Sequence, residues 1–153
     1  MEHNYFMGLA LEEAKKAYEI GEVPIGAIIV RDNQVIASAF NKRELGRNAT
    51  HHAELLAIQE ACEKLGGWRL IGCTMYVTLE PCLMCAGAII NSRLERLIYG
   101  ARDPKAGAVQ SLYHVLEDTR LNHQVEVIEG VLAAESSALL KDFFANLRLK
   151  NKS

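Results

Sequence analysis

Two short motifs in this sequence carry side chains that could together bind a metal ion and activate water. His52-Ala53-Glu54 supplies an imidazole and a carboxylate, and Pro81-Cys82-Leu83-Met84-Cys85 supplies two thiols. Zinc prefers imidazole and thiolate ligands, and a site with three protein ligands keeps its fourth position open for water, as catalytic zinc sites do. Zinc lowers the pKa of such a water toward about 7, so that hydroxide is available at neutral pH. We therefore predict a catalytic zinc site with His52, Cys82 and Cys85 as the ligands and Glu54 as the proton donor and acceptor.

The same cysteines allow two other interpretations. A structural zinc site would need a fourth ligand, which His51, Cys62 or Cys73 could supply. A Cys-x-x-Cys pair by itself is also typical of a redox dithiol. Cys62 and Cys73 fit better as small core residues of a helix and a strand, and His52, unlike His51, stands two residues before Glu54. The sequence favours catalytic zinc over structural zinc, and either of them over a redox dithiol.

The hydrophobic pattern predicts the helices and strands that must position these motifs. Apolar residues recur at three- and four-residue steps in some segments, which is typical of amphipathic helices, and form short β-branched runs in others, which is typical of strands. Strands that alternate with helices indicate an α/β fold in which part of the sheet is parallel. The chain of 153 residues shows no repeat or linker, so we expect a single domain over residues 1–153. Helices are predicted over 5–20, 52–65, 81–90, 111–116 and 133–148, and strands over 25–30, 35–40, 74–79, 97–99 and 125–128.

The strand predicted over 74–79 runs almost directly into Pro81. Proline is tolerated in the first turn of a helix because its missing N–H would be unpaired there. With a helix that opens at Pro81, Cys82 and Cys85 lie one turn apart on the same face, the spacing needed to hold one ion. Glu80, the other acidic residue beside this motif, is expected to support the zinc site from behind its ligands.

The start of the helix predicted over 52–65 decides whether His52 and Glu54 can share a site. Residues two apart deep in a helix point to nearly opposite sides, so His52 must lie in the first turn or just before it. The preceding segment, 41–50, has no apolar periodicity and is predicted as a loop, which permits that placement.

Composition places the chain among soluble globular proteins. Half of its residues are hydrophobic and 24% are charged. No apolar run approaches the roughly 20 residues of a membrane span, and the N-terminus reads as an amphipathic segment without a signal peptide. We expect a cytoplasmic protein that binds no membrane, in which the four cysteines are ligands or buried thiols and not disulfides.

The net charge of −2 argues mildly against extensive nucleic-acid binding. Lysines and arginines nevertheless gather in three segments, and they would form a local basic rim if these segments converge in space. If they do not converge, they are ordinary surface charges. The residues concerned are Lys42, Arg43, Arg47, Arg102, Lys105, Arg148, Lys150 and Lys152.

His52-Ala53-Glu54 together with Pro81-Cys82-x-x-Cys85 resembles the signature of zinc-dependent nucleobase deaminases. The sequence is more closely similar to the bacterial tRNA-specific adenosine deaminases of the cytidine/deoxycytidylate deaminase superfamily, over essentially the whole chain. Many members of that family carry a glycine- and cysteine-rich stretch where residues 106–110 stand here, so this chain departs from the family at a loop expected near the RNA. The matching segments are 23–27, 78–88, 99–105, 121–123 and 142–144, of which 78–88 is highly specific.

The resemblance implies a three-layer α/β/α sandwich with a five-stranded mixed sheet, the cytidine deaminase-like fold. It also implies a homodimer with one zinc ion per subunit. The implied reaction is hydrolytic deamination of adenosine to inosine at the wobble position of a tRNA anticodon, with the tRNA anticodon stem-loop as the partner. The residues that the resemblance places against the substrate are Asn41, Ala53, Asp103, Phe143 and Phe144.

Several alternatives stay open from the sequence. The same zinc site could serve a deaminase of a free base or nucleoside, such as guanine, and a misplaced Glu54 would leave a non-catalytic RNA-binding or structural zinc protein. Asn41 could simply be a turn residue at the end of a strand, and Asp103 could belong to an ordinary turn. Phe143 and Phe144 point about 100° apart on a helix, so we expect at least one of them in the core.

Overall fold

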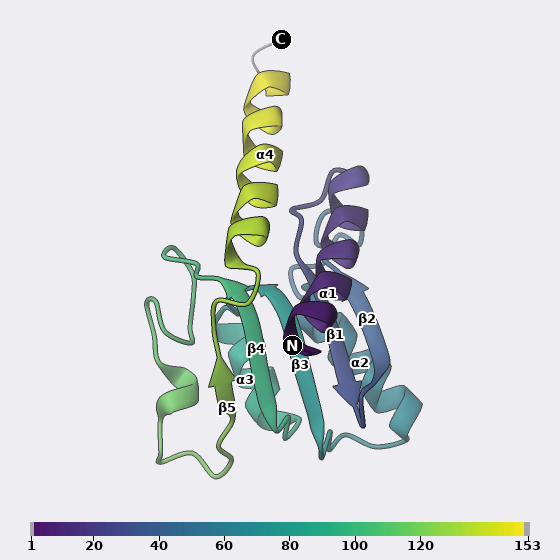
Figure 1. Ribbon diagram of the computed structural model, residues 1–153, viewed down its shortest axis with the longest axis vertical. Coiled ribbons are helices and arrows are strands. Elements are labelled where there is room, and N and C mark those ends of the chain that lie inside the picture. Colours follow the sequence, from purple (N-terminus) through teal and green to yellow (C-terminus); the bar gives the residue numbers. More distant parts are fainter. Residues whose placement is uncertain (1, 152–153) are drawn as a thin grey trace.

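A five-stranded mixed sheet forms the middle layer of the computed structural model, which describes residues 2–151 (Figure 1). In chain order the elements are α1 (Glu2–Glu19), β1 (Gly26–Arg31), β2 (Gln34–Phe40), α2 (Ala53–Leu65), β3 (Cys73–Leu79), α3 (Leu83–Asn91), β4 (Arg96–Ala101), the 3₁₀ helix η1 (Val115–Glu117), β5 (Glu126–Ile128) and α4 (Ala133–Asn151). The strand order is β2-β1-β3-β4-β5; β1 is antiparallel to β2 and β3, whereas β3, β4 and β5 are parallel. The predicted α/β/α sandwich with a mixed sheet is confirmed.

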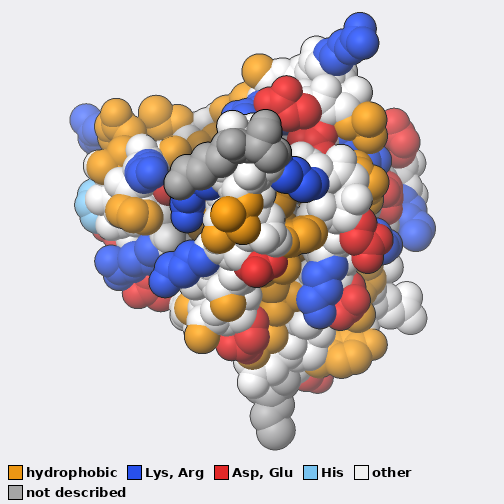
Figure 2. All heavy atoms as spheres, turned by 90° about the horizontal axis from the view of Figure 1, so that it is seen from above, with side chains coloured by type: hydrophobic (Ala, Val, Ile, Leu, Met, Phe, Trp, Pro, Cys, Tyr) orange, Lys and Arg blue, Asp and Glu red, His pale blue; other side chains and the backbone are white. Residues whose placement is uncertain are grey.

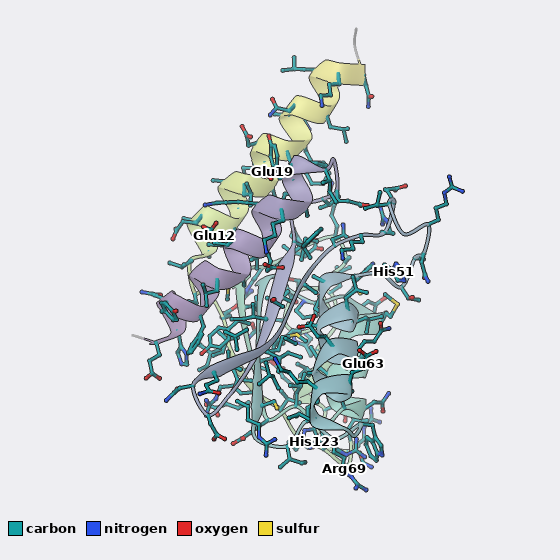
Figure 3. The ribbon with its side chains drawn as sticks, turned by 90° about the vertical axis from the view of Figure 1, so that its right-hand side faces the viewer. Glu12, Glu19, His51, Glu63, Arg69 and His123 are labelled. Atoms are coloured by element: carbon teal, nitrogen blue, oxygen red, sulfur yellow. The ribbon has the colours of Figure 1, made fainter. Side chains whose placement is uncertain are left out.

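Alternation along the strands divides the apolar side chains between two cores. In β1, Ala27 and Ile29 join one core and Ile28 and Val30 join the other, because successive residues of a strand point to opposite faces. The first core lies beneath α2 and α3 and the second beneath α1, with α4 packed on β4. Figure 3 shows α1 and α4 on one side of the sheet and α2 on the other. Both faces are therefore covered, which is why β1, β3 and β4 are buried along most of their length.

The predicted hairpin between β1 and β2 closes through Asp32 and Asn33, whose φ angles are 51° and 60°. Positive φ at both central residues is the geometry of a type I′ turn, whose twist matches that of the flanking strands. Short polar side chains such as Asn and Asp tolerate this left-handed conformation better than most. Because β1 is antiparallel to both β2 and β3, those two strands end at the same edge of the sheet.

Two predicted helices differ from the structure in ways that affect the site. The helix expected from Pro81 begins at Leu83, because Cys82 keeps an extended backbone (φ −78°, ψ 179°) and serves as the N-cap of α3. No α-helix forms over 111–116: the stretch begins with a turn, and η1 covers only its last two residues. The backbone N–H groups of residues 109–111 donate hydrogen bonds to the carboxylate of Glu80, so the chain curves around this side chain just before the stretch.

The two longest helices, α1 and α4, lie on the same side of the sheet, and the second half of α4 projects beyond it (Figure 1). Leu147 and Leu149 in the projecting half are exposed. Within residues 2–151, however, no helix combines the length and the apolar character that crossing a membrane would require.

Candidate active site

The four residues of the predicted zinc site converge where β2 and β3 end and α2 and α3 begin. His52 is the N-cap of α2 and Cys82 is the N-cap of α3, and both have extended backbone angles. Glu54 and Cys85 follow in the first turns of these helices. His52 therefore lies just before its helix, as its spacing to Glu54 required. The neighbouring His51 marks this end of α2 in Figure 3.

The ligand atoms of His52, Cys82 and Cys85 have the separations of a tetrahedral zinc site. The Sγ atoms of Cys82 and Cys85 lie 3.7 and 3.6 Å from Nδ1 of His52, and all three atoms are within 4.8 Å of one another. Zinc bonds of about 2.3 Å to sulfur and 2.0 Å to nitrogen, opened at the tetrahedral angle, would put the ligand atoms about 3.5 Å apart. Within residues 2–151 no other group of His, Cys, Asp and Glu side chains is placed to hold a metal ion. The donors present therefore fit zinc.

The candidates for a fourth protein ligand lie elsewhere. The thiols of Cys62 and Cys73 are directed at nearby backbone carbonyls, 3.9 and 3.7 Å away, and the ring of His51 lies against Gly46. All four cysteines are free thiols. The cluster thus offers a metal ion three protein ligands, the number typical of a catalytic zinc site and not of a structural one.

Hydrogen bonding polarises the two thiols of the cluster. The thiol of Cys85 donates to Cys82, and together with His52 it lowers the pKa of Cys82 to about 4 in spite of partial burial. The same bond raises the pKa of Cys85, and the hydrogen bond with Cys82 raises the pKa of His52. One thiolate is therefore formed readily, and a cation among the three ligands favours the second.

Glu54 is the buried acid of the site, with 4% of its surface exposed. Burial raises the pKa of its carboxyl to about 7, although a backbone hydrogen bond partly opposes the shift. The carboxyl also lies within hydrogen-bonding reach of Cys85. A general acid/base works best when its pKa is near the operating pH, so Glu54 is suited to take up and release a proton at neutral pH.

A cavity of about 190 Å³ opens beside the cluster and is lined by three of the five residues expected to touch the substrate. Asn41 comes from the end of β2, Ala53 is the first residue of α2, and Asp103 lies on the loop after β4. The cavity therefore joins the metal cluster to residues from both flanking loops. Its apolar walls come from Val23, Ile25 and Leu79.

Asn41 is held in one orientation at this cavity. Its Nδ2 donates to the carbonyl oxygen of Val23 at 3.3 Å, and its Oδ1 accepts from the N–H of Arg43 at 3.2 Å. A carboxamide has two N–H donors and two acceptor lone pairs, so one of each is left for a ligand. Asn41 thus ends its strand as a turn residue and also lines the cavity.

Glu80 faces the loop of residues 103–111, which corrects the prediction that it supports the ligands. Its carboxylate accepts hydrogen bonds from four backbone N–H groups and one hydroxyl of that loop. Burial alone would raise the pKa of Glu80, but these hydrogen bonds outweigh it and the pKa is lowered. In the sequence Glu80 stands close to the ligand Cys82, but its side chain points to a loop that is more than twenty residues away along the chain.

Phe143 and Phe144 lie on α4, outside the cavity. Phe143 is 7% exposed and packs edge-on against Tyr18 of α1, with ring centroids 5.5 Å apart. Phe144 is 41% exposed and lines a separate surface groove. The expectation that at least one of the pair belongs to the core is confirmed. The basic residues of the groove are Lys105, Lys141 and Arg148.

The basic segments of the sequence converge only in part. Three basic side chains share the groove beside Phe144, and Arg43 lines the cavity. Arg102 instead forms two hydrogen bonds of 2.8 and 2.9 Å with Glu129, which neutralises its charge. Lys152 lies outside the described residues. Seen from above, Lys and Arg side chains are interspersed with hydrophobic ones (Figure 2).

Sequence reasoning missed Glu22, which shapes the other side of the cavity. It is 2% exposed and accepts the N–H groups of Glu44 and Leu45 in the loop that follows Asn41. Its position directly before the apolar segment that begins at Val23 could have indicated burial, and a buried charged side chain needs hydrogen-bond partners.

Comparison with known proteins identifies the family. The family model for MafB19-like deaminases matches residues 1–148. The tRNA-specific adenosine deaminase of Bacillus subtilis (strain 168) is 52% identical over 148 residues, which cover 97% of this chain and 92% of that protein. A solved structure from a study of A-to-I editing by tRNA:A34 deaminases matches with a TM-score of 0.86 and 48% identity, covering 89% of this chain and 99% of the other. A guanine deaminase from Nitrosomonas europaea matches with a TM-score of 0.80 but 26% identity, over 93% of this chain and 84% of the other. The chain therefore belongs to the deaminases, in the family of tRNA-specific adenosine deaminases.

Proposed function

We propose that this chain is an enzyme that converts adenosine to inosine by hydrolytic deamination at the wobble position of a tRNA anticodon. The observation that carries the proposal is Glu54 beside the cluster of His52, Cys82 and Cys85 at one open cavity, in a chain 52% identical to a tRNA-specific adenosine deaminase. Enzymes that act on a nucleobase take it out of the stack into a pocket of this kind. The deaminase domain spans residues 1–153.

The metal of the site would be zinc, which Nδ1 of His52 and the Sγ atoms of Cys82 and Cys85 would hold. The separations of 3.6 and 3.7 Å between the ring nitrogen and the sulfurs support this assignment. A zinc ion held there supplies Lewis-acid activation of water at neutral pH. Placement of His52 and Cys82 at helix N-caps fixes both ligands on rigid elements.

Glu54 moves the proton in this reaction. Hydrolytic deamination requires one group that takes a proton from the attacking water and delivers it to the departing amino nitrogen. A buried carboxyl whose pKa is raised to about 7 can do both at neutral pH. The carboxyl also lies on the cavity wall, where it can reach a bound base.

Asn41, Ala53 and Asp103 hold the nucleoside. Asn41 has one amide N–H and one lone pair of Oδ1 left after its bonds to the protein. Ala53 lines the cavity with a small side chain that leaves room for a base, and Asp103 adds a carboxylate from the loop after β4. Asn41 and Asp103 thus add polar groups to a cavity that also has apolar walls from Val23, Ile25 and Leu79, which suits a planar base with polar edges.

The groove on α4 binds the anticodon stem-loop outside the cavity. Proteins recognise single-stranded RNA loops by stacking bases on aromatic side chains and by contacts from basic side chains to the backbone. Exposed Phe144 with Lys105, Lys141 and Arg148 provides this combination. Phe143 supports the surface from beneath through its packing against Tyr18 and Phe144.

The enzyme is a cytoplasmic homodimer with one zinc ion per subunit. Exposed Leu83 and Met84 in the first turn of α3 support an association surface close to the site. Light scattering on the purified protein would measure the mass, and a monomer at micromolar concentration would contradict the dimer.

One observation favours a second function, the deamination of a free base such as guanine. The guanine deaminase from Nitrosomonas europaea shares the fold over most of this chain. Its identity of 26% is about half of the 52% shared with the tRNA-specific enzyme, so the free base is the less supported substrate.

The direct test offers both substrate classes to the purified protein. We expect inosine in an anticodon stem-loop with adenosine at the wobble position, and no product from free adenosine, free guanine or a stem-loop with guanosine there. Product analysis by chromatography of the digested RNA separates the outcomes. Turnover of free guanine without turnover of the stem-loop would establish the second function and remove the first.

A further inference from the structure

The loop of residues 102–111 forms one wall of the cavity without a helix or strand of its own. Asp103 and Ala106 face the cavity, and Lys105 faces the groove on α4. Few backbone bonds hold it from within, among them Gly107 N–H to the carbonyl of Asp103 at 2.8 Å. The Oδ1 atom of Asp103 also accepts the N–H groups of Lys105 and Ala106 at 3.1 and 3.3 Å, whereas residues 109–111 depend on contacts outside the loop.

Glu80 supplies those contacts. One of its carboxylate oxygens accepts the successive N–H groups of Val109, Gln110 and Ser111 at 3.0, 2.7 and 2.9 Å. The other accepts the N–H of Asp103 at 3.0 Å and the hydroxyl of Ser111. Successive N–H groups that converge in this way form a concavity that binds anions, and here the anion is a side chain of the same protein.

This carboxylate has no capacity left for the metal cluster. A carboxylate offers about four lone-pair positions, and Glu80 accepts five hydrogen bonds from the loop while only 2% of its surface is exposed. Every hydrogen bond that its side chain makes within residues 2–151 goes to this loop.

Gly107 and Gln110 show how closely the loop is fitted to Glu80. A Cβ atom at Gly107 would collide with the carboxyl group of Glu80 and with the carbonyl oxygen of Asp103. The side chain of Gln110 bonds the hydroxyl of Tyr99, which also bonds Glu129 at 2.9 Å. The loop is thus held at several points, with Glu80 at the centre.

We infer that Glu80 is a positioning residue for the RNA substrate: it shapes the loop that presents Asp103 to the nucleoside and Lys105 to the RNA. It acts on substrate binding, and the metal and the proton transfer at Glu54 do not depend on it. The inference rests on the proposed function, since the substrate is the anticodon stem-loop.

Glu80→Gln tests the inference because it keeps the size of the side chain and turns one acceptor oxygen into an N–H donor that faces N–H donors. We expect KM for the stem-loop to rise about tenfold, with kcat within about threefold of the wild-type value and an unchanged zinc content. Hydrogen exchange at the amides of 109–111 should become faster. Glu13→Gln is the matched control, since Glu13 is also a buried acid but lies on α1 and pairs with Lys16; its KM should stay within about twofold.

Gly107→Ala disturbs the same fit from the loop side and leaves the carboxylate intact, so it keeps the test valid if Glu80→Gln does not fold. It should also raise KM for the stem-loop without loss of zinc. An unchanged KM in the folded variants would overturn the inference, and so would loss of zinc with a collapse of kcat, which would make Glu80 a support of the metal site. If the wild-type protein forms no inosine, the proposed function fails first. The loop inference is then decided by hydrogen exchange, since unchanged exchange at 109–111 in both variants overturns it.

Discussion

The cluster of His52, Cys82 and Cys85 and the two loops beside it meet at the same cavity, but they are held in place in different ways. The cluster stands at the starts of α2 and α3, where residues two or three apart in sequence are neighbours in space. The loops of residues 41–51 and 102–111 have no regular structure, and each is held by one buried carboxylate, Glu22 for the first and Glu80 for the second. Chemistry and substrate recognition therefore depend on separable parts of the fold, and variants should affect one part without the other.

The largest effect should come from breaking the cluster. Cys85→Ala removes one of three ligands from a buried site, so we expect no stoichiometric zinc and no detectable inosine formation. Elemental analysis of the purified protein measures the metal, and the stem-loop assay measures the activity. Cys62→Ala is the matched control because Cys62 is a free thiol outside the cluster. Loss of zinc in the control would place Cys62 among the ligands and contradict the three-ligand site.

Glu54→Ala should abolish the proton transfer and leave metal binding unchanged. The substitution leaves the three ligand atoms in place, so we expect full zinc occupancy and a kcat lowered about 10²- to 10⁴-fold, the usual contribution of a general acid/base. Single-turnover rates on saturating stem-loop would measure the chemical step. A kcat close to the wild-type value would remove Glu54 from the mechanism.

The same contrast explains what the sequence could predict. The cluster was predictable because His52, Glu54, Cys82 and Cys85 lie in two short motifs at helix starts, where spacing alone decides which side chains can meet. The five-stranded sheet followed from β-branched runs alternating with amphipathic helices. The helix expected at 111–116 did not form because the N–H of Ser111 goes to distant Glu80 and those of Leu112, Tyr113 and Val115 go to the carbonyls of Gly107 and Ala108.

Residues that depend on such long-range partners could not be read from spacing. Nothing local indicates that Glu22 reaches the loop of Glu44 and Leu45, twenty-two and twenty-three residues away. Nor could a pattern decide which of two adjacent phenylalanines is buried, since that depends on where α1 packs against α4. Helical periodicity required only that the two rings point in different directions.

A smaller effect should distinguish these two rings. Phe144→Ala removes an exposed ring from the groove, and stacking of a base on an aromatic side chain is worth about 1–3 kcal/mol, so KM for the stem-loop should rise about tenfold with unchanged stability. Phe143→Ala empties a buried position against Tyr18 and should cost about 3–5 kcal/mol of unfolding free energy. Urea denaturation and steady-state kinetics on both variants give the comparison. An unchanged KM in Phe144→Ala would remove this groove from the RNA-binding surface.

The smallest effect is expected at Glu22, and it sharpens the contrast between the two loops. Glu22 accepts hydrogen bonds from the backbone N–H groups of Glu44 and Leu45. Because Leu45 is 67% exposed, we expect water to replace the acceptor that its N–H loses in Glu22→Gln. Glu80 instead accepts the N–H of Val109. Val109 is fully buried, so water cannot replace a lost acceptor there. We expect KM for the stem-loop to rise only about threefold in Glu22→Gln, against about tenfold in Glu80→Gln.

The double variant Glu22→Gln/Glu80→Gln completes this comparison. Because the two carboxylates share no hydrogen-bond partner among the residues that the structure describes, their effects on KM should multiply to about thirtyfold, as expected for independent sites. A KM in the double variant no higher than in Glu80→Gln would mean that the loops move together. The two walls would then form one recognition element, and the cavity would be shaped by their coupling and not by each buried acid separately.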